Sequence, residues 1–374
     1  MTPIEELSLI LRPSGGGLYL VSTGRREQEE LQKRLYQVES EAEVQAAFEA
    51  KLHQLSQAKI VILGVPSDVG AGFLRGANIG PQAIRQRLLL LYPDWSDFLQ
   101  RNQIIDVGDV FVVPQLLHDE MLSASQLERS RRALYPKHPN ESLPVSPLSI
   151  EERALDLILS INPKIAPVII GGDHSTAWPV ASALSRVLGN GWGIVQPDAH
   201  TDLLPERLGV KYCFATWSHH ANELLGRGQK LVQVGIRASR FPKEHWEKLC
   251  DVRQFWAQEC LAKPKEEVVA DIIAHLKSVG VTRVYFSNDI DGTDASFADA
   301  TGTPEPGGVD PDFILHLIER LGAEIGLCAG DIVEVAPPIQ RTPDGAARTT
   351  TLAARYLKAT LDAILASVPL DPVT

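Results

Sequence analysis

GWGIVQPDAHTD (Gly191–Asp202) joins an unbroken apolar run to a group of acidic and histidine residues, and it indicates both the fold class and the chemistry. The apolar run is typical of a strand that is buried on both faces of a sheet. Asp198, His200 and Asp202 follow at intervals of two residues, so their side chains would project from one face at the end of the strand. The stretch therefore predicts a parallel sheet with a polar site at the carboxyl end of one strand.

Two other apolar runs are followed by residues of the same kind. His174 lies just beyond APVIIGG (166–172), and Asp289 and Asp291 follow VTRVYF (281–286) with the same spacing of two. One such residue alone is more often a helix cap or a turn former than a metal ligand. Four closely packed carboxylates would repel each other unless cations held them. Together they predict a site for two divalent ions, and mixed oxygen and imidazole donors favour Mn²⁺, Ni²⁺, Co²⁺ or Zn²⁺ over Ca²⁺.

Charge and composition exclude several other classes of protein. The 374 residues are 44% hydrophobic and carry a formal net charge of −11, which argues against nucleic-acid binding because that affinity needs basic groups. The sequence shows neither an apolar stretch of membrane-spanning length nor a basic-then-apolar leader, so we expect neither a membrane span nor a signal peptide. We expect a cytoplasmic location. The four cysteines lack CxxC spacing, which argues against a disulfide framework and a structural zinc site.

Strand-like runs alternate with helical patterns along the chain, which implies parallel βαβ units. We expect a three-layer α/β/α sandwich with a mostly parallel sheet, formed by one catalytic domain over residues 58–374, although the length alone would also permit two domains. Ser149–Glu152 reads as a capping box, and Asp310 before Pro311 as a second helix start. The predicted strands are KIVILGV (59–65), APVIIGG (166–172), GWGIVQ (191–196), KLVQVGI (230–236), TRVYFS (282–287) and AEIGLCA (323–329).

Two segments lie outside this pattern. Residues 1–57 are predicted to form an N-terminal extension whose charged stretch from Arg26 to Leu55 is helical and too polar for a core helix. It would lie on the surface of its own domain or contact another subunit. Residues 111–147 form a long connection rich in proline, serine and charge. Such connections are uncommon unless they cover a site or a subunit contact.

At these residues the chain resembles the ureohydrolase family, the arginase and agmatinase group. The resemblance covers roughly residues 58–365 and includes further runs in the family's order. It implies an arginase-like α/β fold, a binuclear metal hydrolase and a homo-oligomer, a trimer or a hexamer. The further runs are GVPSDVGAGFLRGANIGPQAIR (64–85), DVGDV (106–110), QVGIR (233–237), ATGTPEPGG (300–308) and GDIVEVAPP (330–338).

The resemblance also assigns roles to the metal ligands. It implies that Asp198 and Asp289 bridge both ions, so that the ions share one water, lower its pKa and hold the resulting hydroxide as nucleophile. The remaining ligands complete the two shells, and they are His174 and Asp202 for one ion and His200 and Asp291 for the other.

Two acids have further roles in this scheme. Glu334 of DIVEV matches the carboxylate that pairs with the substrate guanidinium, for which a bidentate carboxylate is the natural partner. A structural salt bridge is the alternative role for Glu334. Asp202 can also accept a proton from the nucleophile and pass it to the leaving amine.

The chain departs from the family pattern in two places. Many members carry a His-Gly pair, with the histidine as proton shuttle, some dozen residues after DAHxD. Here that stretch reads KYCFATWSHHAN (211–222), and Phe214 stands at the shuttle's place. The usual DPxxAPGTGTP loop is altered to DASFADATGTP (294–304), so the rim that faces the substrate should have another shape and an additional acid, Asp299.

Three aromatic residues in the first altered segment bear on the substrate. Tyr212, Phe214 and Trp217 either pack the core or line a small pocket whose ring faces would attract a cation. In the second case the chain resembles, in its SNDIDGTD and YCFATW runs, the family branch that hydrolyses free guanidine and is associated with nickel. That branch implies hydrolysis of guanidine to urea and ammonia, Ni²⁺ in preference to Mn²⁺, and metal-delivery accessory proteins as candidate partners.

Two alternatives remain open. The first is a ureohydrolase for guanidinobutyrate, agmatine or arginine, whose distal group would need Arg207, Lys211 or Asp299 as a partner. The second is a catalytically inactive scaffold that only binds metal. Intact ligands and an intact Glu334 argue against the second alternative.

Overall fold

The computed structural model describes residues 1–367, which fold around one nine-stranded sheet. The strand order is β1-β3-β2-β4-β9-β8-β5-β6-β7, and all neighbouring strands are parallel except β1 and β3. This confirms the predicted α/β class and the mostly parallel sheet. The strands are β1 (Leu11–Arg12), β2 (Ile60–Gly64), β3 (Ile104–Val110), β4 (Ala166–Ile170), β5 (Trp192–Pro197), β6 (Leu231–Ile236), β7 (Arg253–Trp256), β8 (Arg283–Asp289) and β9 (Leu327–Val333).

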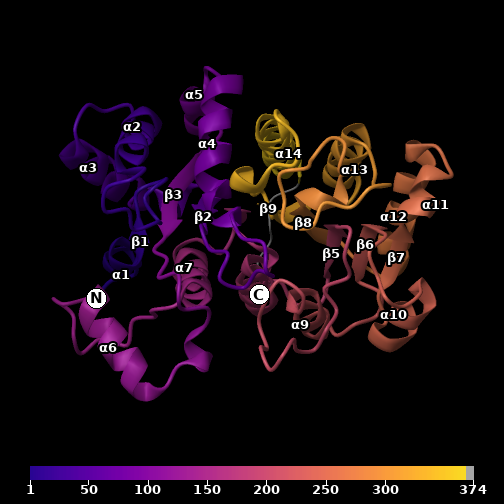
Figure 1. Cartoon of the computed structure of the whole chain (residues 1–374), viewed down its shortest axis with the longest axis horizontal. Coiled ribbons are helices and arrows are strands. Elements are labelled where there is room, and N and C mark those ends of the chain that lie inside the picture. The colour runs from indigo at the N-terminus through magenta and orange to yellow at the C-terminus, as the bar shows by residue number, and fades with distance from the viewer. Residues whose placement is uncertain (368–374) are drawn as a thin grey trace.

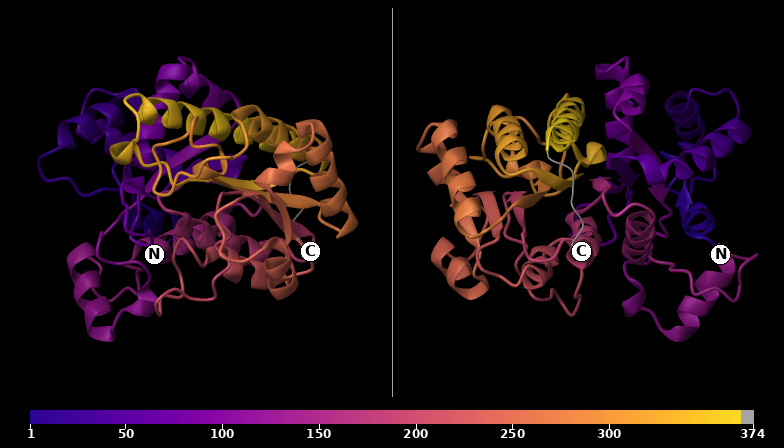
Figure 2. Two further views of the ribbon diagram at one scale, coloured as in Figure 1. Left: turned by 45° about the vertical axis from the view of Figure 1, so that its right-hand side comes forward. Right: turned by 180° about the vertical axis from the view of Figure 1, so that it is seen from behind.

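Helices cover both faces of the sheet, as Figures 1 and 2 show, and form the outer layers of the predicted three-layer sandwich. On one face lie α7 (Pro147–Ile161), α8 (Ala177–Val187), α9 (Trp217–Leu224) and α10 (Lys243–Cys250). The other face carries α4 (Gly80–Leu91), α5 (Trp95–Arg101), α12 (Lys265–Ser278), α13 (Pro311–Glu324) and α14 (Gly345–Ala366). The remaining helices are α1 (Pro3–Ile10), α2 (Arg25–Tyr36), α3 (Glu41–Leu52), α6 (Ala124–Leu134) and α11 (Ala257–Leu261).

The alternation of side chains along a strand explains why the strands are continuously apolar. In β2, Val61 and Leu63 belong to the core under α7 and α8, whereas Ile60 and Ile62 belong to the core under α4 and α14. Successive side chains of a strand point to opposite faces, so a strand covered on both sides needs apolar residues at every position. The unbroken apolar runs therefore predict the two-sided covering as well as the strands.

Some predicted boundaries were wrong. The capping box at Ser149–Glu152 is wrong because α7 already begins at Pro147, and the Ser149 hydroxyl accepts the N–H of Asp119 at 3.0 Å instead. The run 323–329 begins too early, because α13 extends to Glu324 and β9 starts at Leu327. The prediction at Asp310 is confirmed, since its Oδ1 accepts the N–H of Phe313 at 2.7 Å. Three strands, β1, β3 and β7, were not predicted.

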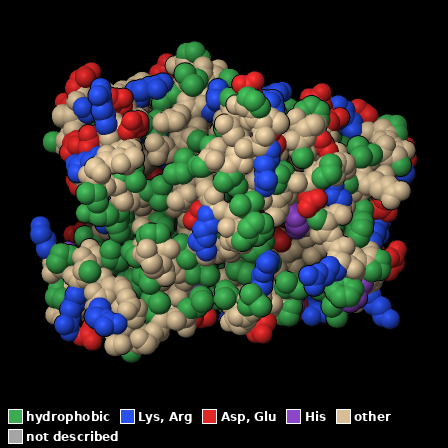
Figure 3. Space-filling model, in the orientation of Figure 1, with side chains coloured by type: hydrophobic (Ala, Val, Ile, Leu, Met, Phe, Trp, Pro, Cys, Tyr) green, Lys and Arg blue, Asp and Glu red, His purple; other side chains and the backbone are tan. Residues whose placement is uncertain are grey.

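The N-terminal segment packs on the sheet. The stretch expected to be one charged helix forms two, α2 and α3, and Phe48 and Leu52 of α3 are fully buried in the same core as α7. The connection 111–147 contains α6. Apolar side chains gather between the N-terminal helices and α6 in Figure 3, around a groove of about 820 Å³ lined by Leu18, Tyr19, Phe111 and Leu134 among others. A subunit contact there remains a prediction.

Two further observations concern the whole described chain. The four cysteines, Cys213, Cys250, Cys260 and Cys328, are free and buried. Among residues 1–367 the structure contains no helix with the length and apolar character that a bilayer crossing requires.

Candidate metal centre

Four neighbouring strands deliver the predicted site residues to one edge of the sheet. In the order β4-β9-β8-β5, each strand is followed at its carboxyl end by at least one of them. His174 opens a short 3-10 helix after β4, Glu334 follows β9, Asp289 ends β8, and Asp198 comes directly after β5. Because parallel strands end at the same edge, residues more than 150 positions apart meet in one place.

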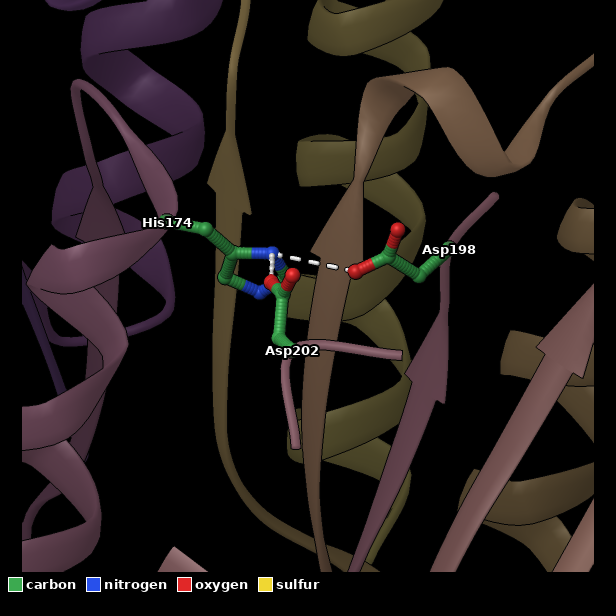
Figure 4. A group of neighbouring side chains, drawn as sticks. All are labelled: His174, Asp198 and Asp202. Carbon is green, nitrogen blue, oxygen red and sulfur yellow. Dashed lines mark ion pairs between the residues drawn. The ribbon is translucent and has the colours of Figure 1, made fainter. Parts of the chain in front are cut away.

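The first group of ligand atoms surrounds the imidazole of His174. Its Nδ1 lies 3.2 Å from Oδ2 of Asp198, 3.4 Å from Oδ2 of Asp202 and 3.1 Å from Oδ2 of Asp289. Figure 4 shows His174, from the segment after β4, and Asp198 and Asp202, from the segment after β5, pointing toward one another. All four side chains are buried. Three carboxylate oxygens around one imidazole nitrogen make a donor set that fits a divalent transition ion.

Hydrogen bonds behind His174 fix which of its nitrogens faces the carboxylates. Ser287 Oγ donates to Oδ2 of Asp331 at 2.8 Å, so it can only accept from His174 Nε2, which lies 3.1 Å away. The proton of a neutral imidazole is therefore assigned to Nε2, and Nδ1 keeps its lone pair. Nδ1 is buried and makes no hydrogen bond to a described residue. A cation at this position would supply the missing partner.

The second group consists of Asp198, His200 and Asp291. Nδ1 of His200 lies 3.2 Å from Oδ2 of Asp291 and 3.6 Å from Oδ1 of Asp198. Asp198 thus belongs to both groups and turns a different oxygen to each, which is the arrangement of a bridging ligand. Asp289 turns Oδ2 to His174, while its Oδ1 accepts the N–H of Asp291 at 2.9 Å. Bridging by Asp289 remains a prediction.

The electrostatics of the cluster favour a bound cation. Burial, followed by the neighbouring carboxylates, raises the pKa of Asp202 and of Asp289 well above the ordinary range. Burial would lower the pKa of His174, but Asp198 and Asp289 outweigh it and raise that pKa well above its usual value. Because these pKa values are raised, the acids and the imidazole keep protons that they would otherwise release. A divalent cation would satisfy the same lone pairs and remove the repulsion.

Glu334 stands beside this cluster with a strained backbone. Its φ of 60° lies in the left-handed region, as does the φ of 51° at Asp202. Such conformations are costly for residues other than glycine and are concentrated at functional sites. Oε1 of Glu334 accepts the N–H of His174 at 2.9 Å, and a side chain at Gly302 would place its Cβ 3.7 Å from Oε2. The glycine thus leaves open the space that its Cβ would fill beside Oε2.

The aromatic residues expected in the pocket lie in different places. Trp217 is fully buried behind the cluster, and its indole N–H donates to Oδ2 of Asp202 at 3.1 Å. Tyr212 is buried and stacks on Trp178, with the ring centroids 4.7 Å apart. The structure therefore places Trp217 against the proposed ligands and Tyr212 in the apolar core beside Trp178. Phe214 lines a groove.

That groove has a volume of about 570 Å³, and its lining residues include none of the proposed ligands. Phe214 N–H donates to the carbonyl of Gly70 at 3.2 Å, and Gly70 N–H donates to Oδ2 of Asp173, the neighbour of His174, at 3.0 Å. The guanidinium of Arg207 lies over the Phe214 ring, 4.7 Å from its centroid. Residues of loop 69–75 line the groove together with Phe214.

The additional acid of the altered loop is engaged elsewhere. Asp299 is 4% exposed, its Oδ2 accepts the hydroxyl of Thr342, and it pairs with Arg348 at 3.5 Å. These partners belong to α14 and the segment before it. In this arrangement Asp299 stabilises the start of α14 and belongs to neither group of proposed metal ligands.

Several supporting residues were missed at the sequence level. Gln196 donates to Oδ2 of Asp198 at 2.7 Å, and Arg237 donates to the carbonyl of Asp291 at 2.6 Å. Ser287 and Asp331 support His174 as described above. The available signal was a polar residue inside or at the end of an otherwise apolar buried strand, since such a residue needs a specific partner.

Comparison with known proteins places these observations in a wider group. A sequence model described as the Arginase family matches residues 58–361. The guanidinobutyrase of Pseudomonas aeruginosa is 30% identical over 317 residues, which cover 83% of this chain and 85% of that protein. The mitochondrial agmatinase of Gallus gallus is 31% identical, over 74% of this chain and 73% of that protein.

Solved structures show the same likeness. The proclavaminate amidino hydrolase of Streptomyces clavuligerus superposes with a TM-score of 0.65 and 25% identity, and covers 83% of this chain and 93% of its own. The agmatine ureohydrolase of Thermoplasma volcanium gives a TM-score of 0.60 with 25% identity, over 83% of this chain and 91% of its own.

Proposed function

We propose, from the premise that this chain belongs to the arginase family, that it hydrolyses a small guanidino compound and releases urea. The family and its relatives make it a hydrolase of guanidino C–N bonds. The observation that carries the proposal is the position of Asp198 between two groups of ligand atoms, with Glu334 beside them.

The side chains of the two groups would hold a pair of divalent ions. When bound, the pair supplies a water whose pKa is low enough for it to act as a nucleophile near neutral pH. The mixed nitrogen and oxygen donors suit Mn²⁺ and Ni²⁺ alike. We propose Ni²⁺, because it ranks above Mn²⁺ in affinity for sites that contain nitrogen.

The protein's own groups would bind and orient the substrate. Oε2 of Glu334 would accept N–H groups of the guanidinium, and a charge-assisted pair of this kind gains strength where water is excluded. Oδ2 of Asp202 already accepts the Trp217 indole, which leaves Oδ1 as the oxygen that can take a proton from the nucleophile and return it to the leaving nitrogen.

Free guanidine is one candidate substrate, and the closed form of the site favours it. The side chain of His200 is 27% exposed, whereas His174, Asp198 and Glu334 are no more than 9% exposed. A compound without a tail needs only this narrow opening. Phe214 lines the groove described above, where an aromatic ring face can attract a small cation.

A guanidino acid such as guanidinobutyrate is the second candidate, and the comparisons favour it. One relative is named a guanidinobutyrase and another a human mitochondrial guanidino acid hydrolase, 28% identical to this chain. The groove of Phe214 is lined by two arginines, Arg75 and Arg207, and by no acidic residue, although Arg75 also pairs with the carboxylate of Asp68 at 3.8 Å. Arginine is a natural partner for a carboxylate tail, whereas the ammonium tail of agmatine would be repelled.

Urea release from a panel of compounds separates these candidates. The protein, loaded with Ni²⁺ or with Mn²⁺, is assayed with guanidine, methylguanidine, guanidinobutyrate, agmatine and arginine, and kcat/KM is compared. The highest kcat/KM for guanidine would select the first candidate, and the highest value for guanidinobutyrate would select the second. Failure to release urea from any of the five by protein with two ions per chain would contradict the proposed function. Light scattering of the same samples tests the expected trimer or hexamer.

A further inference from the structure

Three buried glutamines form a ladder across the sheet beside the metal centre. Gln196, Gln233 and Gln254 are fully buried and lie on the adjacent strands β5, β6 and β7. The strand register pairs Gln196 with Gln233, and Gln233 with Gln254. All three side chains therefore stand at one level and on one face of the sheet. Amides at these positions are unexpected, because the strands around them are apolar.

The side-chain amides are linked head to tail. Gln254 Nε2 donates to Oε1 of Gln233 at 2.7 Å, and Gln233 Nε2 donates to Oε1 of Gln196 at 2.9 Å. Gln196 Nε2 donates to Oδ2 of Asp198 at 2.7 Å. At the outer end the indole N–H of Trp256 donates to Oε1 of Gln254 at 2.9 Å. The chain of hydrogen bonds thus runs without a break from β7 to the shared metal ligand.

The two ends determine the direction of every bond. The carboxylate of Asp198 can only accept, so Gln196 must turn its NH₂ group toward it and its oxygen toward Gln233. The indole of Trp256 can only donate, so Gln254 must turn its oxygen outward. The assignment of oxygen and nitrogen in all three amides follows from these ends. Hydrogen bonds aligned in one direction polarise one another, which strengthens the last one.

A second contact ties the ladder to the loop that carries the other ligands. Gln233 Nε2 also donates to the carbonyl of Thr201 at 2.6 Å, next to Asp202. Ser218 Oγ donates to Oε1 of Gln196 at 2.6 Å, which supplies that oxygen with a second donor. The ladder therefore holds both the side chain of Asp198 and the backbone that leads to Asp202.

The bridging carboxylate needs this kind of restraint. Oδ2 of Asp198, which accepts from Gln196, also faces Nδ1 of His174 at 3.2 Å. Oδ1, which faces His200, accepts the backbone N–H of His200 at 2.6 Å. Each oxygen has one fixed donor and one direction left for a cation. A carboxylate held in this way loses less conformational entropy when it binds two ions.

We propose that Gln196, Gln233 and Gln254 are positioning residues that fix the orientation of the Asp198 carboxylate and thereby set the metal affinity of the centre. The inference rests on the proposed metal centre, but its test is metal binding and needs no substrate. Its distinctive consequence is that Gln254, on β7 and two amides away from Asp198, influences metal affinity without touching a ligand.

The first test measures metal dissociation constants of purified apoprotein by competition with a chromophoric chelator. Methionine has a similar length and no amide, so Gln196→Met and Gln254→Met interrupt the ladder at its inner and outer ends. We expect Kd for Ni²⁺ to rise about tenfold or more for Gln196→Met, in the range of other residues that support metal ligands, and about threefold for Gln254→Met. The matched control is Gln28→Met, a buried glutamine on α2 that donates to the carbonyl of Leu18.

The second test is the double variant Gln196→Met with Gln254→Met. If the ladder acts as one unit, the outer substitution changes Kd little once Gln196 is gone, so the two effects are not additive. The visible spectrum of the Co²⁺-loaded protein should change in Gln254→Met as well, because the geometry at the ion responds to the orientation of Asp198. Additive effects, or a wild-type Kd and spectrum for folded Gln254→Met, would overturn the proposal.

A milder variant guards against loss of folding. Trp256→Phe removes only the terminal donor at a half-buried position and should raise Kd in the same direction by a smaller factor. Circular dichroism of each apoprotein verifies that the variants are folded. A wild-type protein that binds two ions but releases no urea would contradict the proposed function, but it would not contradict the positioning role of the three glutamines. Urea release by the wild type, together with an unchanged Kd in all ladder variants, would support the proposed function and contradict the positioning role of the glutamines.

Discussion

Trp217 donates its indole N–H to Oδ2 of Asp202 over 3.1 Å, and its ring centroid lies 4.5 Å from that of His174. One fully buried side chain therefore contacts two proposed ligands of the same ion from behind. The N–H and the proposed ion that Oδ2 and His174 would share occupy Oδ2 of Asp202, which leaves Oδ1 to act on a proton, and the ring restricts the tilt of the imidazole. Trp217 thus supports the ligands and does not face the substrate.

Trp217→Phe should lower activity while metal remains bound. The ring that packs on His174 is retained, but Asp202 loses a hydrogen bond to a charged group that contributes about 1.5 to 3 kcal/mol. We expect kcat/KM for urea release to fall by roughly 10- to 150-fold. The matched control is Trp178→Phe, in a ring that stacks on Tyr212. Equal rates for Trp217→Phe and the wild type would show that the indole N–H has no part in the reaction.

Removal of the shared ligand should affect both ions. Asp198→Ala takes one oxygen from each group of ligand atoms, so we expect fewer than one ion per chain and no urea release. Asp289→Ala takes an oxygen that faces His174, and we expect fewer than two ions per chain. Metal content after gel filtration, measured by mass spectrometry, provides the comparison. Two ions bound to Asp198→Ala would refute the bridging role.

The sequence could predict the edge of the sheet at which the ligands meet, because an apolar run typical of a buried strand precedes the ligands in each motif. Asp198 follows a strand and Asp289 ends a strand that is buried on both faces, and such strands require neighbouring strands and covering helices. The supports could not be predicted in the same way. Gln254 is linked to Asp198 by hydrogen bonds through Gln233 on β6 and Gln196 on β5. The order of the strands in the sheet cannot be predicted from the residues of any single strand. Trp217 could equally have packed the core or lined a pocket until the fold placed it behind His174.

Glu334→Gln should separate substrate binding from metal binding. The amide keeps the shape of the side chain but removes the charge that would pair with a guanidinium. Loss of one partner of a buried charge pair costs about 2 to 4 kcal/mol, so we expect kcat/KM to fall by roughly 30- to 900-fold. Metal content should stay at the wild-type value. A normal rate in this variant would place guanidinium recognition elsewhere.

Arg85→Met should destabilise the fold without acting on the site directly. Arg85 is 1% exposed on α4, bonds both oxygens of Asp106 at 2.8 and 2.9 Å, and also contacts Asp109. Its removal leaves the carboxylates of Asp106 and Asp109 buried without the guanidinium that hydrogen-bonds both, which typically costs about 3 to 5 kcal/mol. Denaturant unfolding of the apoprotein measures the change. A loss below about 1 kcal/mol would contradict the assigned role.

The same network has a pH dependence of known sign. Burial would raise the pKa of Asp106, but Arg85 outweighs it and lowers that pKa below the ordinary value. A lowered carboxyl pKa contributes stability above the unfolded value of about 4 and loses it as the pH falls through the folded value. Burial raises the pKa of Asp109, whose contribution has the opposite sign, since one arginine does not offset the burial of both acids. The wild type should therefore lose more of its stability than Arg85→Met between pH 5 and strongly acidic pH.

Phe214→Ala should shift the substrate preference. The ring lines the groove together with Gly72, where an added Cβ would lie 3.4 Å from Cζ of Phe214. Its removal takes away a ring face that attracts a small cation, at a cost of about 0.5 to 2 kcal/mol, and opens space for a tail beside Arg207. We expect kcat/KM for guanidine to fall and the ratio of guanidinobutyrate to guanidine to rise by roughly 10-fold or more. Phe73→Ala, in a ring on the same groove that is 89% exposed, is the matched control. An unchanged ratio in Phe214→Ala would mean that this ring does not limit substrate length, and the selection would then have to come from the opening around His200 and Glu334.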